Sequence, residues 1–181
     1  MSIATRTGDK GKTGLLHGQR VPKDHPQIEV VGAFDELNVE VGAARMLARD
    51  PGAPALLGAV QASLVALMGE LACAEADAAR HAKSKFARLS EGDLRRLDEF
   101  LAALESRGIR LDGWATPGAN PEALAFDRAR VAARRAERRL AALPPAVRTV
   151  RPLLLQWTNR LSDLLWLLAR EAEARGGPAG A

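Results

Sequence analysis

The chain has 181 residues, 47% of them apolar, so it is long enough to form one domain with a buried core. Its formal charge of +4 suits a polyanionic small molecule as well as a nucleic acid. Because Cys73 is the single cysteine, we expect neither a disulfide framework nor a cysteine-based metal site. The hydropathy pattern predicts no signal peptide and no membrane span, so we expect a cytoplasmic protein without a membrane partner.

The first segment, residues 1–25, has the composition of a strap that binds a polyphosphate. It contains the run Thr5-Arg6-Thr7-Gly8-Asp9-Lys10-Gly11-Lys12-Thr13-Gly14 and, further on, Lys23. Glycines let backbone N–H groups crowd around an anion, threonine hydroxyls donate to it, and cationic side chains neutralise it. The run resembles the end of a Walker A loop, but Arg6 stands where that loop needs glycine. A flexible, solvated terminus is the alternative interpretation.

Five helices are predicted after this strap. Capping residues and proline or glycine signals place them at residues 26–48, 54–79, 90–108, 120–143 and 152–175. Residues 80–89 form a basic connection, and residues 176–181 form a tail. No alternation of apolar and polar residues predicts a sheet. We expect one all-α domain, residues 1–175, folded as a five-helix up-and-down bundle with an extended N-terminal strap.

One carboxylate lies where the interior of a helix bundle should be apolar. On the helix 26–48, Asp35 is in line with an apolar stripe that we expect to be buried, made of Ile28, Val31, Val39, Gly42 and Met46. A buried carboxylate needs a partner, because a lone buried charge costs several kcal/mol. An arginine of the helix 120–143 is the obvious candidate.

The last two helices carry polar residues on shared faces. Arg130, Arg134, Glu137 and Arg138 fall on one face of the helix 120–143 by their spacing. On the helix 152–175, a second polar line is formed by Asn159, Asp163 and Arg170. Each line is either a functional surface or a solvated face held by salt bridges.

The three histidines add no expected site. His17, His25 and His81 lie in separate loops or termini and lack the spacing of metal ligands. The sequence therefore predicts no metal-ligand cluster in the protein, and it offers no Ser–His–Asp or Cys–His order for nucleophilic catalysis.

Several segments match one family in order along the chain. They are residues 5–14, Val21-Pro22-Lys23-Asp24, Gly32-Ala33-Phe34-Asp35-Glu36-Leu37-Asn38, Pro117-Gly118, residues 129–138, and Asn159-Arg160-Leu161-Ser162-Asp163. Through these motifs the chain resembles the PduO-type ATP:cob(I)alamin adenosyltransferases over nearly its whole length. The resemblance implies a ferritin-like bundle that assembles as a homotrimer with active sites between subunits.

The same resemblance implies an activity. Members of the family transfer the 5′-deoxyadenosyl group of ATP to the cobalt of cob(I)alamin, using Mg²⁺, and release adenosylcobalamin and triphosphate. A reductase and an adenosylcobalamin-dependent enzyme are possible further partners, and nucleic acid is not among them.

The resemblance also assigns site residues. ATP contacts fall on the strap at Thr5, Arg6, Thr7, Gly8, Thr13, Gly14 and Lys23, and on the bundle at Arg134, Arg135, Glu137, Arg138 and Asn159. The reacting centre is assigned to Asp35, Arg130, Arg134 and Trp114, with Asp35 and Arg130 as a buried pair on the corrinoid side. Trp114 takes the place of a wall residue that displaces the lower axial ligand of the corrinoid.

Three changes on the corrinoid side, at four positions, depart from the family pattern. Trp114 replaces phenylalanine, Ala119-Asn120 replaces Gly-Ser, and Asp127 replaces histidine. A second hypothesis is therefore an ATP-binding nucleotide sensor or corrinoid-delivery protein with reduced or lost turnover. Nucleic-acid binding through the arginine-rich helix is a third and weaker hypothesis, because only 4% of residues are aromatic and available for stacking.

Overall fold

A computed structural model of the chain describes residue 4 and residues 6–109 and 114–176. The assigned site residue Thr5 and most of the expected tail lie outside this part of the chain. Its elements are β1 (Lys12–Gly14), β2 (Arg20–Pro22), α1 (Pro26–Leu47), α2 (Ala53–Leu71), the 3₁₀ turn η1 (Glu75–Asp77), α3 (Ala78–Ala82), α4 (Glu91–Glu105), α5 (Pro121–Ala141) and α6 (Pro152–Gly176).

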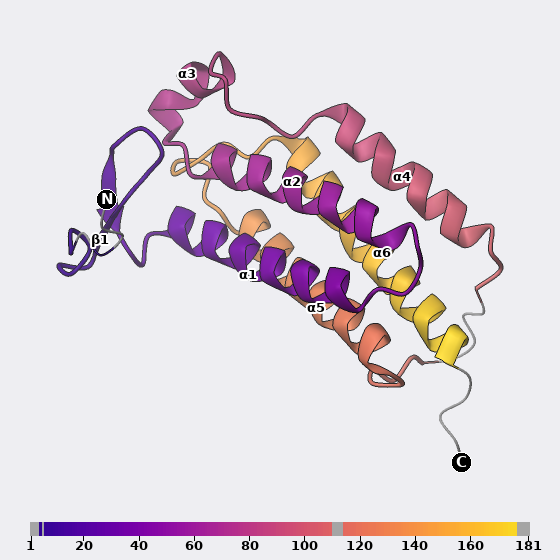
Figure 1. The fold of residues 1–181 in the computed structure, drawn as a ribbon. Helices are drawn as coiled ribbons and strands as arrows, with labels where there is room; N and C mark the ends of the chain where they lie inside the picture. Colours follow the sequence, from indigo (N-terminus) through magenta and orange to yellow (C-terminus); the bar gives the residue numbers. More distant parts are fainter. Residues whose placement is uncertain (1–3, 5, 110–113, 177–181) are drawn as a thin grey trace.

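The long helices lie side by side in a bundle, and the predicted all-α fold is confirmed (Figure 1). Successive long helices run in opposite directions, with α5 packed against both α1 and α6. Helix α2 packs on the other side of α1, and α4 packs on α6. Short connections between antiparallel neighbours favour this up-and-down arrangement.

Two helix starts form where the sequence predicts them, because the capping side chains are present. Ser90 and Asp93 form a capping box at the start of α4. At the start of α5, the Asn120 side chain accepts a hydrogen bond from the Ala123 N–H at 2.9 Å. Asn120 also donates to the Ala172 carbonyl at 2.9 Å, which joins the start of α5 to the end of α6.

The helix expected at residues 54–79 ends earlier than the sequence predicts. Helix α2 ends at Leu71, and the chain turns before the short segments η1 and α3. The buried side chain of Gln27 holds this break, because its Nε2 atom donates to the carbonyls of Leu71 and Cys73 at 2.6 and 2.8 Å. A side chain from α1 therefore takes over two carbonyls near the end of α2.

The sequence predicts the wrong face of α1 to be buried. The core face of α1 carries Val30, Phe34, Leu37 and Val41, each at most 2% exposed. Within the predicted stripe, Val39 and Met46 are 68% and 88% exposed, and Asp35 is exposed too. Its other members, Ile28, Val31 and Gly42, are only half-buried. Apolar residues recur at helical spacing on both faces of α1, so periodicity alone cannot identify the inner one.

The N-terminal strap contains a short β-hairpin, although no sheet is expected from the sequence pattern. Strands β1 and β2 pair antiparallel, with Lys12 opposite Pro22 and Gly14 opposite Arg20. The hairpin is attached to the bundle, because the Leu16 N–H donates to the Ala72 carbonyl at 2.9 Å and the Leu15 side chain is buried.

Buried ion pairs fix the two ends of the bundle. Glu70 is 1% exposed, and its carboxylate accepts hydrogen bonds from Arg151 at 2.5 and 2.7 Å and lies 3.5 Å from Arg88. At the opposite end, the buried Glu122 accepts from Arg175 at 2.6 Å. Burial alone would raise the pKa of Glu70, but the hydrogen bonds and charges of Arg151 and Arg88 hold it below its usual value.

Helix α2 is apolar and long enough to cross a membrane by length and composition. An 18-residue window within it has a mean hydropathy of 1.5. Half of that window is buried inside the bundle, where Leu57, Leu64 and Leu67 are fully enclosed. A core helix can have the same length and hydropathy as a membrane-spanning helix. The packing of α2 therefore explains its apolar character, which is only weak support for a membrane span.

Candidate functional site

The glycine-rich segment of the strap forms a tight loop that leads into β1. The Asp9 N–H donates to the Arg6 carbonyl and the Gly11 N–H donates to the Gly8 carbonyl, so the chain folds back within a few residues. Gly11 has a φ of 72°, a conformation that favours glycine. Arg6 has a φ of 57° and is the one described non-glycine residue in this left-handed region.

Arg20 of β2 clamps this loop, a role that sequence reasoning missed. Its Nη2 atom donates to the carbonyls of Thr7 and Lys12 at 2.7 and 2.9 Å. The two acceptors lie on either side of the loop, so a single guanidinium fixes its width. The backbone N–H of Lys23 donates to the Gly11 carbonyl at 2.9 Å and adds a second tie.

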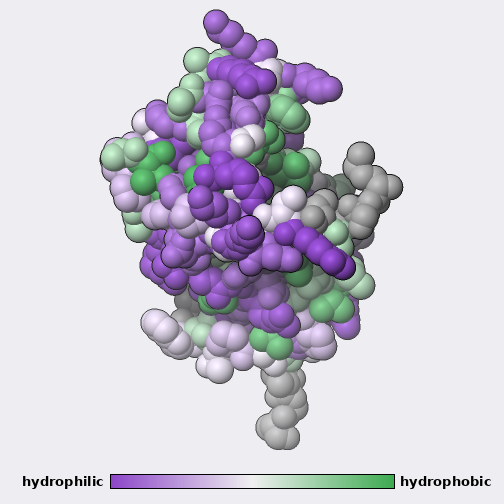
Figure 2. Space-filling view, turned by 90° about the vertical axis from the view of Figure 1, so that its left-hand side faces the viewer, coloured by the Kyte–Doolittle hydropathy of each residue, from purple (hydrophilic) through white to green (hydrophobic). Residues whose placement is uncertain are grey.

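Lys23 and Gly8 lie against each other, as their assignment to one strap requires. A Cβ atom added at Gly8 would lie 3.3 Å from Nζ of Lys23, so the absence of a side chain lets the lysine approach. Thr13 is half-buried within β1, and Gly14 follows it. The ammonium, the loop backbone and the threonine therefore lie on one small hairpin. Figure 2 shows that the end of the molecule carrying this hairpin is mainly hydrophilic.

Apart from Arg130, which bonds to Asp127 of the same helix, the arginines of α5 fall into two groups. The first group bonds to acidic residues of α1: Arg128 contacts Glu40, Arg135 contacts Glu36, and Arg139 contacts Glu29. None of these three arginines belongs to the predicted polar line of Arg130, Arg134, Glu137 and Arg138, so their ion pairs form on another part of the helix surface. The second group is Arg134 and Arg138, which are exposed and have no ion pair with any residue that the structure describes.

Glu137 lies between the two unpaired arginines in sequence. It is half-buried and likewise has no hydrogen bond or ion pair within the described part of the chain. Asn159 of α6 is half-buried, and its side-chain oxygen accepts a long hydrogen bond of 3.4 Å from Arg160. Among the described residues, no hydrogen bond or ion pair joins the hairpin to Arg134, Glu137 or Arg138. Within the described part of one chain, no direct bond therefore holds the two assigned halves of the ATP site together.

The expected buried pair of Asp35 and Arg130 does not form within the chain. Asp35 is exposed on the outer side of α1, whereas Arg130 donates from Nε to the Asp127 carboxylate at 2.9 Å. Asp127 is three residues before Arg130 on the same helix, so the two side chains meet without help from α1. The carboxylate buried beside Arg130 is that of Asp127, which is only 3% exposed.

Asp127 is the centre of a buried ion cluster between α5 and α6. Arg170, which is 6% exposed, lies 2.5 Å from the Asp127 carboxylate and 3.0 Å from that of Glu173. Burial raises the pKa of Glu173, with the Arg170 charge lowering it and the Asp127 charge raising it further. The Arg170 guanidinium also lies over the ring of Trp166, 5.8 Å from its centroid.

Two cavities adjoin this cluster. One, of about 250 Å³, is lined by Trp114, Ala115, Asp127, Arg130, Trp166 and Arg170. The other, of about 560 Å³, lies between α4 and α6, and Trp166 borders it too; its other lining residues include Leu101, Ile109, Arg160 and Asp163. Trp114 is 96% exposed, so its ring is available to a molecule that approaches the first cavity.

A family model described as cobalamin adenosyltransferase matches residues 3–172, nearly the whole chain. The chain belongs to the cobalamin adenosyltransferase family. Similar proteins of known function support this family membership. The corrinoid adenosyltransferase PduO of Salmonella typhimurium is 37% identical over 174 residues, which cover 96% of this family member but 50% of the relative. The chain thus spans about half the length of that relative.

Shorter relatives match this family member over most of both chains. The cobalamin adenosyltransferase of Cupriavidus metallidurans is 36% identical over 179 residues, covering 97% of this chain and 90% of the relative. The corrinoid adenosyltransferase of Bacillus subtilis is 35% identical over 177 residues, covering 98% and 89%.

Solved structures of the family have the same fold. A phenylalanine-to-alanine variant of the PduO-type ATP:corrinoid adenosyltransferase from Lactobacillus reuteri, complexed with cobalamin and ATP, superposes with a TM-score of 0.85 at 29% identity. The match covers 96% of this chain and 94% of that one. An arginine-to-lysine variant from the same organism, complexed with ATP, gives a TM-score of 0.81 at 28% identity, covering 95% and 94%.

Proposed function

We propose that this protein transfers the 5′-deoxyadenosyl group of ATP to the cobalt of cob(I)alamin or a related corrinoid, making adenosylcobalamin and releasing triphosphate. The observation that carries the proposal is family membership across residues 3–172, supported by structural relatives complexed with cobalamin and ATP. The chain's own structure offers groups that can bind a triphosphate. They are the glycine-rich hairpin held by Arg20, and Arg134 and Arg138, which have no partner among the described residues.

The triphosphate of ATP is held, in this proposal, by the strap. Arg6, Thr7, Gly8, Thr13, Gly14 and Lys23 surround the phosphates, with Thr5 extending the same segment. Lys23 lies against Gly8, so its charge is placed beside the backbone N–H groups of the loop. Arg134, Arg138, Glu137 and Asn159 complete the nucleotide site, while Arg135 acts through its ion pair with Glu36 of α1.

The two halves of the nucleotide site come from different subunits. Among the described residues of one chain, no hydrogen bond or ion pair joins the hairpin to Arg134 or Arg138, and both arginines are exposed. The outer stripe of α1 exposes Val39 and Met46, and Val131 of α5 is 52% exposed. These exposed apolar side chains are available for contact with a second copy of the chain. We therefore propose a homotrimer in which each site is shared by two neighbours.

Mg²⁺ is the cation that fits this site. It binds oxygen ligands, commonly substrate phosphates together with one or two carboxylates. Glu137 is a half-buried carboxylate without an ion pair among the described residues, so it is the residue that would hold the ion beside the triphosphate. Bound there, Mg²⁺ would neutralise phosphate charge.

The corrinoid side is formed by Trp114 and the two cavities that Trp166 borders. An exposed indole offers a flat apolar wall against one face of the corrin ring, where it would displace the lower axial ligand. Arg130 and Asp127 lie at the back of the smaller cavity. Asp35 contributes from the outer side of α1, where a neighbouring subunit can use it.

The reaction needs little proton transfer. Co(I) donates an electron pair to C5′ of ATP, the C5′–O bond breaks, and triphosphate leaves with the bonding pair, so the cobalt product is formally Co(III). The residues act by positioning and by neutralising the leaving group. Arg134 and Lys23 hold the triphosphate from opposite sides, and Trp114 excludes water from the face of the corrin ring.

An anaerobic assay tests the activity directly. ATP, Mg²⁺ and chemically reduced Co(I) corrinoid are mixed with the purified protein, and formation of the Co–C bond is followed by absorbance while released triphosphate is quantified. We expect equal amounts of the two products. ATP binding by calorimetry without triphosphate release would instead support the sensor or corrinoid-delivery alternative.

Mixing two inactive variants tests the shared site. Lys23→Ala is defective in the strap, and Arg134→Ala is defective in the helix. Random co-assembly restores about a quarter of the sites if each site pairs the strap of one subunit with the helix of its neighbour. No recovery after verified co-assembly would place the whole site within one subunit. We expect the assembly to be soluble and cytoplasmic.

A further inference from the structure

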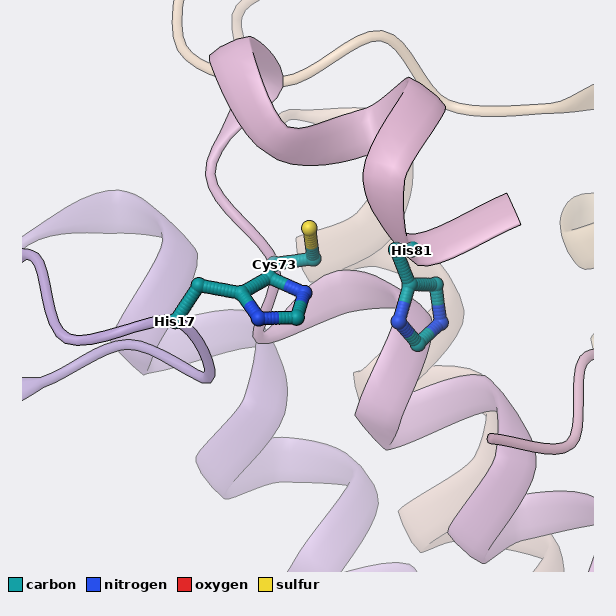
Figure 3. A group of neighbouring side chains, drawn as sticks. All are labelled: His17, Cys73 and His81. Carbon is teal, nitrogen blue, oxygen red and sulfur yellow. The ribbon is translucent and has the colours of Figure 1, made fainter. Parts of the chain in front are cut away.

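Three metal-ligating side chains meet at a point that the proposed reaction does not use. His17, Cys73 and His81 each place a ligand atom within 4.8 Å of the others (Figure 3). His17 comes from the turn between β1 and β2, Cys73 follows the end of α2, and His81 belongs to α3. The expectation of no metal-ligand cluster was based on sequence spacing, which could not show that the break after Leu71 brings these segments together.

The cluster contains buried polar atoms without partners. His81 is 1% exposed, and neither of its ring nitrogens has a hydrogen-bond partner among the described residues. The Nε2 atom of His17 is likewise buried and unpartnered. Buried polar side chains almost always have a partner, and an unpartnered one calls for an unseen ion or water. Two imidazoles unsatisfied at one point, beside a thiol, point to an ion.

The surroundings hold the ligands in place. Phe86 stacks on the His81 ring, with centroids 6.0 Å apart and planes 18° apart. The carbonyl of Cys73 accepts a hydrogen bond from Gln27 at 2.8 Å, which fixes the backbone that carries the thiol. His17 is next to Leu16, whose N–H is bonded to the Ala72 carbonyl. Each ligand is therefore anchored by a contact other than the cluster itself.

We propose that His17 Nε2, Cys73 Sγ and one imidazole nitrogen of His81 bind a zinc-class transition-metal ion, with a water molecule as the fourth ligand. Imidazole and thiolate are the ligands that Zn²⁺ prefers. In a tetrahedral zinc site the ligand atoms lie roughly 3.5 Å apart. The three ligand atoms here lie within 4.8 Å of one another, so small side-chain rotations would bring them to that separation. The thiol gives up its proton to bulk water when the metal binds.

The ion would fasten the nucleotide-binding hairpin to the bundle. Its three ligands lie on the hairpin, on the segment after α2, and on α3, so the ion would add to the hydrogen bonds that join the hairpin to Ala72 and Asp77. The hairpin also carries Thr13 and leads into Lys23. Metal binding would thus stabilise the segment that grips the triphosphate, although the site itself contains no residue assigned to ATP.

Cobalt(II) is the most direct probe. Tag-free protein, freed of metal by a chelator, is titrated with Co²⁺ and examined for a thiolate-to-cobalt charge-transfer band and the d–d bands of a tetrahedral site. Because the chain has one cysteine, a thiolate band can only arise from Cys73. We expect one equivalent of Co²⁺ to bind with both features, and Zn²⁺ to abolish them.

Variants identify the ligands. Cys73→Ser removes the charge-transfer band, and His17→Gln weakens Zn²⁺ binding at least tenfold in a chelator competition. His17→Gln changes a half-buried turn residue, so the fold is retained even if His81→Gln proves unstable. His25→Asn is the control, because it removes the chain's third histidine while keeping an acceptor for the start of α1.

Thermal unfolding gives an independent readout. Zn²⁺ is expected to raise the Tm of the wild-type chain and of His25→Asn, and to leave that of Cys73→Ser unchanged, because only a folded site gains from the ion. A wild-type spectrum without a thiolate band overturns the proposal. So does equal loss of Zn²⁺ affinity in His17→Gln and His25→Asn.

Discussion

Arg170 of α6 and Asp127 of α5 form an ion pair 2.5 Å long in which both side chains are buried. The pair joins the two helices at the wall of a cavity that Trp114 and Trp166 also line. Asp127 stands at the position where the resemblance to the family implies histidine. The chain therefore replaces a residue that could be neutral with one that requires a buried arginine.

Asp127→Asn should destabilise the fold, because it leaves Arg170 buried with one carboxylate, that of Glu173. Breaking a buried pair costs about 3–5 kcal/mol, and the amide keeps part of the hydrogen bonding, so we expect a loss of about 2–3 kcal/mol. Urea unfolding measures it. Asp98→Asn is the matched control, since its pair with Arg160 is exposed and should be worth less than about 1 kcal/mol. Equal losses in both variants would contradict the role of burial.

Arg20→Gln should loosen the strap loop without unfolding the bundle. The variant loses the two charge-assisted bonds to the carbonyls of Thr7 and Lys12. We expect KM for ATP to rise several-fold with a smaller change in kcat, measured by steady-state kinetics at saturating corrinoid. Arg95→Gln, on the exposed side of α4, should leave both constants unchanged. A selective fall in kcat would show that Arg20 does not act by shaping the ATP-binding loop.

Arg134→Ala should reduce kcat/KM for ATP by about 10- to 100-fold, because a hydrogen bond to a charged group is worth about 1.5–3 kcal/mol. Its guanidinium has no partner among the described residues, so little stability should be lost. Arg128→Ala is the control from the same helix, where the guanidinium is already paired with Glu40. The assignment fails if the two variants lose activity equally.

The stability of the fold should fall in acid through Glu70. Its pKa is held below the ordinary value of 4.5 by Arg151 and Arg88, which together outweigh the opposing effect of burial. The stabilisation from this carboxylate is therefore present above that ordinary value and is lost as the pH falls through the lowered one. Urea unfolding of the wild type and Glu70→Gln at several pH values from neutral into acid checks this. The wild type should lose more stability than the variant over that range.

Trp114→Phe and Trp114→Ala separate folding from corrinoid handling. Because the Trp114 side chain is 96% exposed, both variants should keep the wild-type free energy of unfolding within about 0.5 kcal/mol. Trp114→Ala should retain ATP affinity and lose most adenosylation, whereas Trp114→Phe should retain adenosylation. Calorimetry and the anaerobic assay measure the two quantities. If alanine is tolerated as well as phenylalanine, the indole is not the wall of the corrinoid site.

Much of the fold could be predicted from local signals. The caps at Ser90 and Asn120 and the proline at Pro152 act through neighbouring backbone groups, so their effect is present in the sequence. The end of α2 could not be predicted, because the bond from Gln27 to the Leu71 carbonyl comes from a residue 44 positions away. Short strands such as β1 have no periodicity to detect.

For the candidate site too, some features could be predicted from the sequence and others could not. Residue types and order made the strap and the arginines of α5 candidates, since a triphosphate requires that chemistry wherever the segments lie. Which arginine is paired was not predictable, because Arg135 and Arg139 depend on the positions of Glu36 and Glu29 on another helix. The inward face of α1 was also ambiguous, and so Asp35 was misplaced.

Arg134 and Arg138 of α5, which have no partner in the described part of the chain, affect the choice of buffer for this protein. Arg134 and Arg138 are one helical turn apart, so their like charges repel each other until an anion lies between them. Sulfate or phosphate in a buffer would relieve that repulsion and at the same time compete with ATP. Apparent affinity for the nucleotide should therefore depend on the choice of buffer anion as much as on ionic strength.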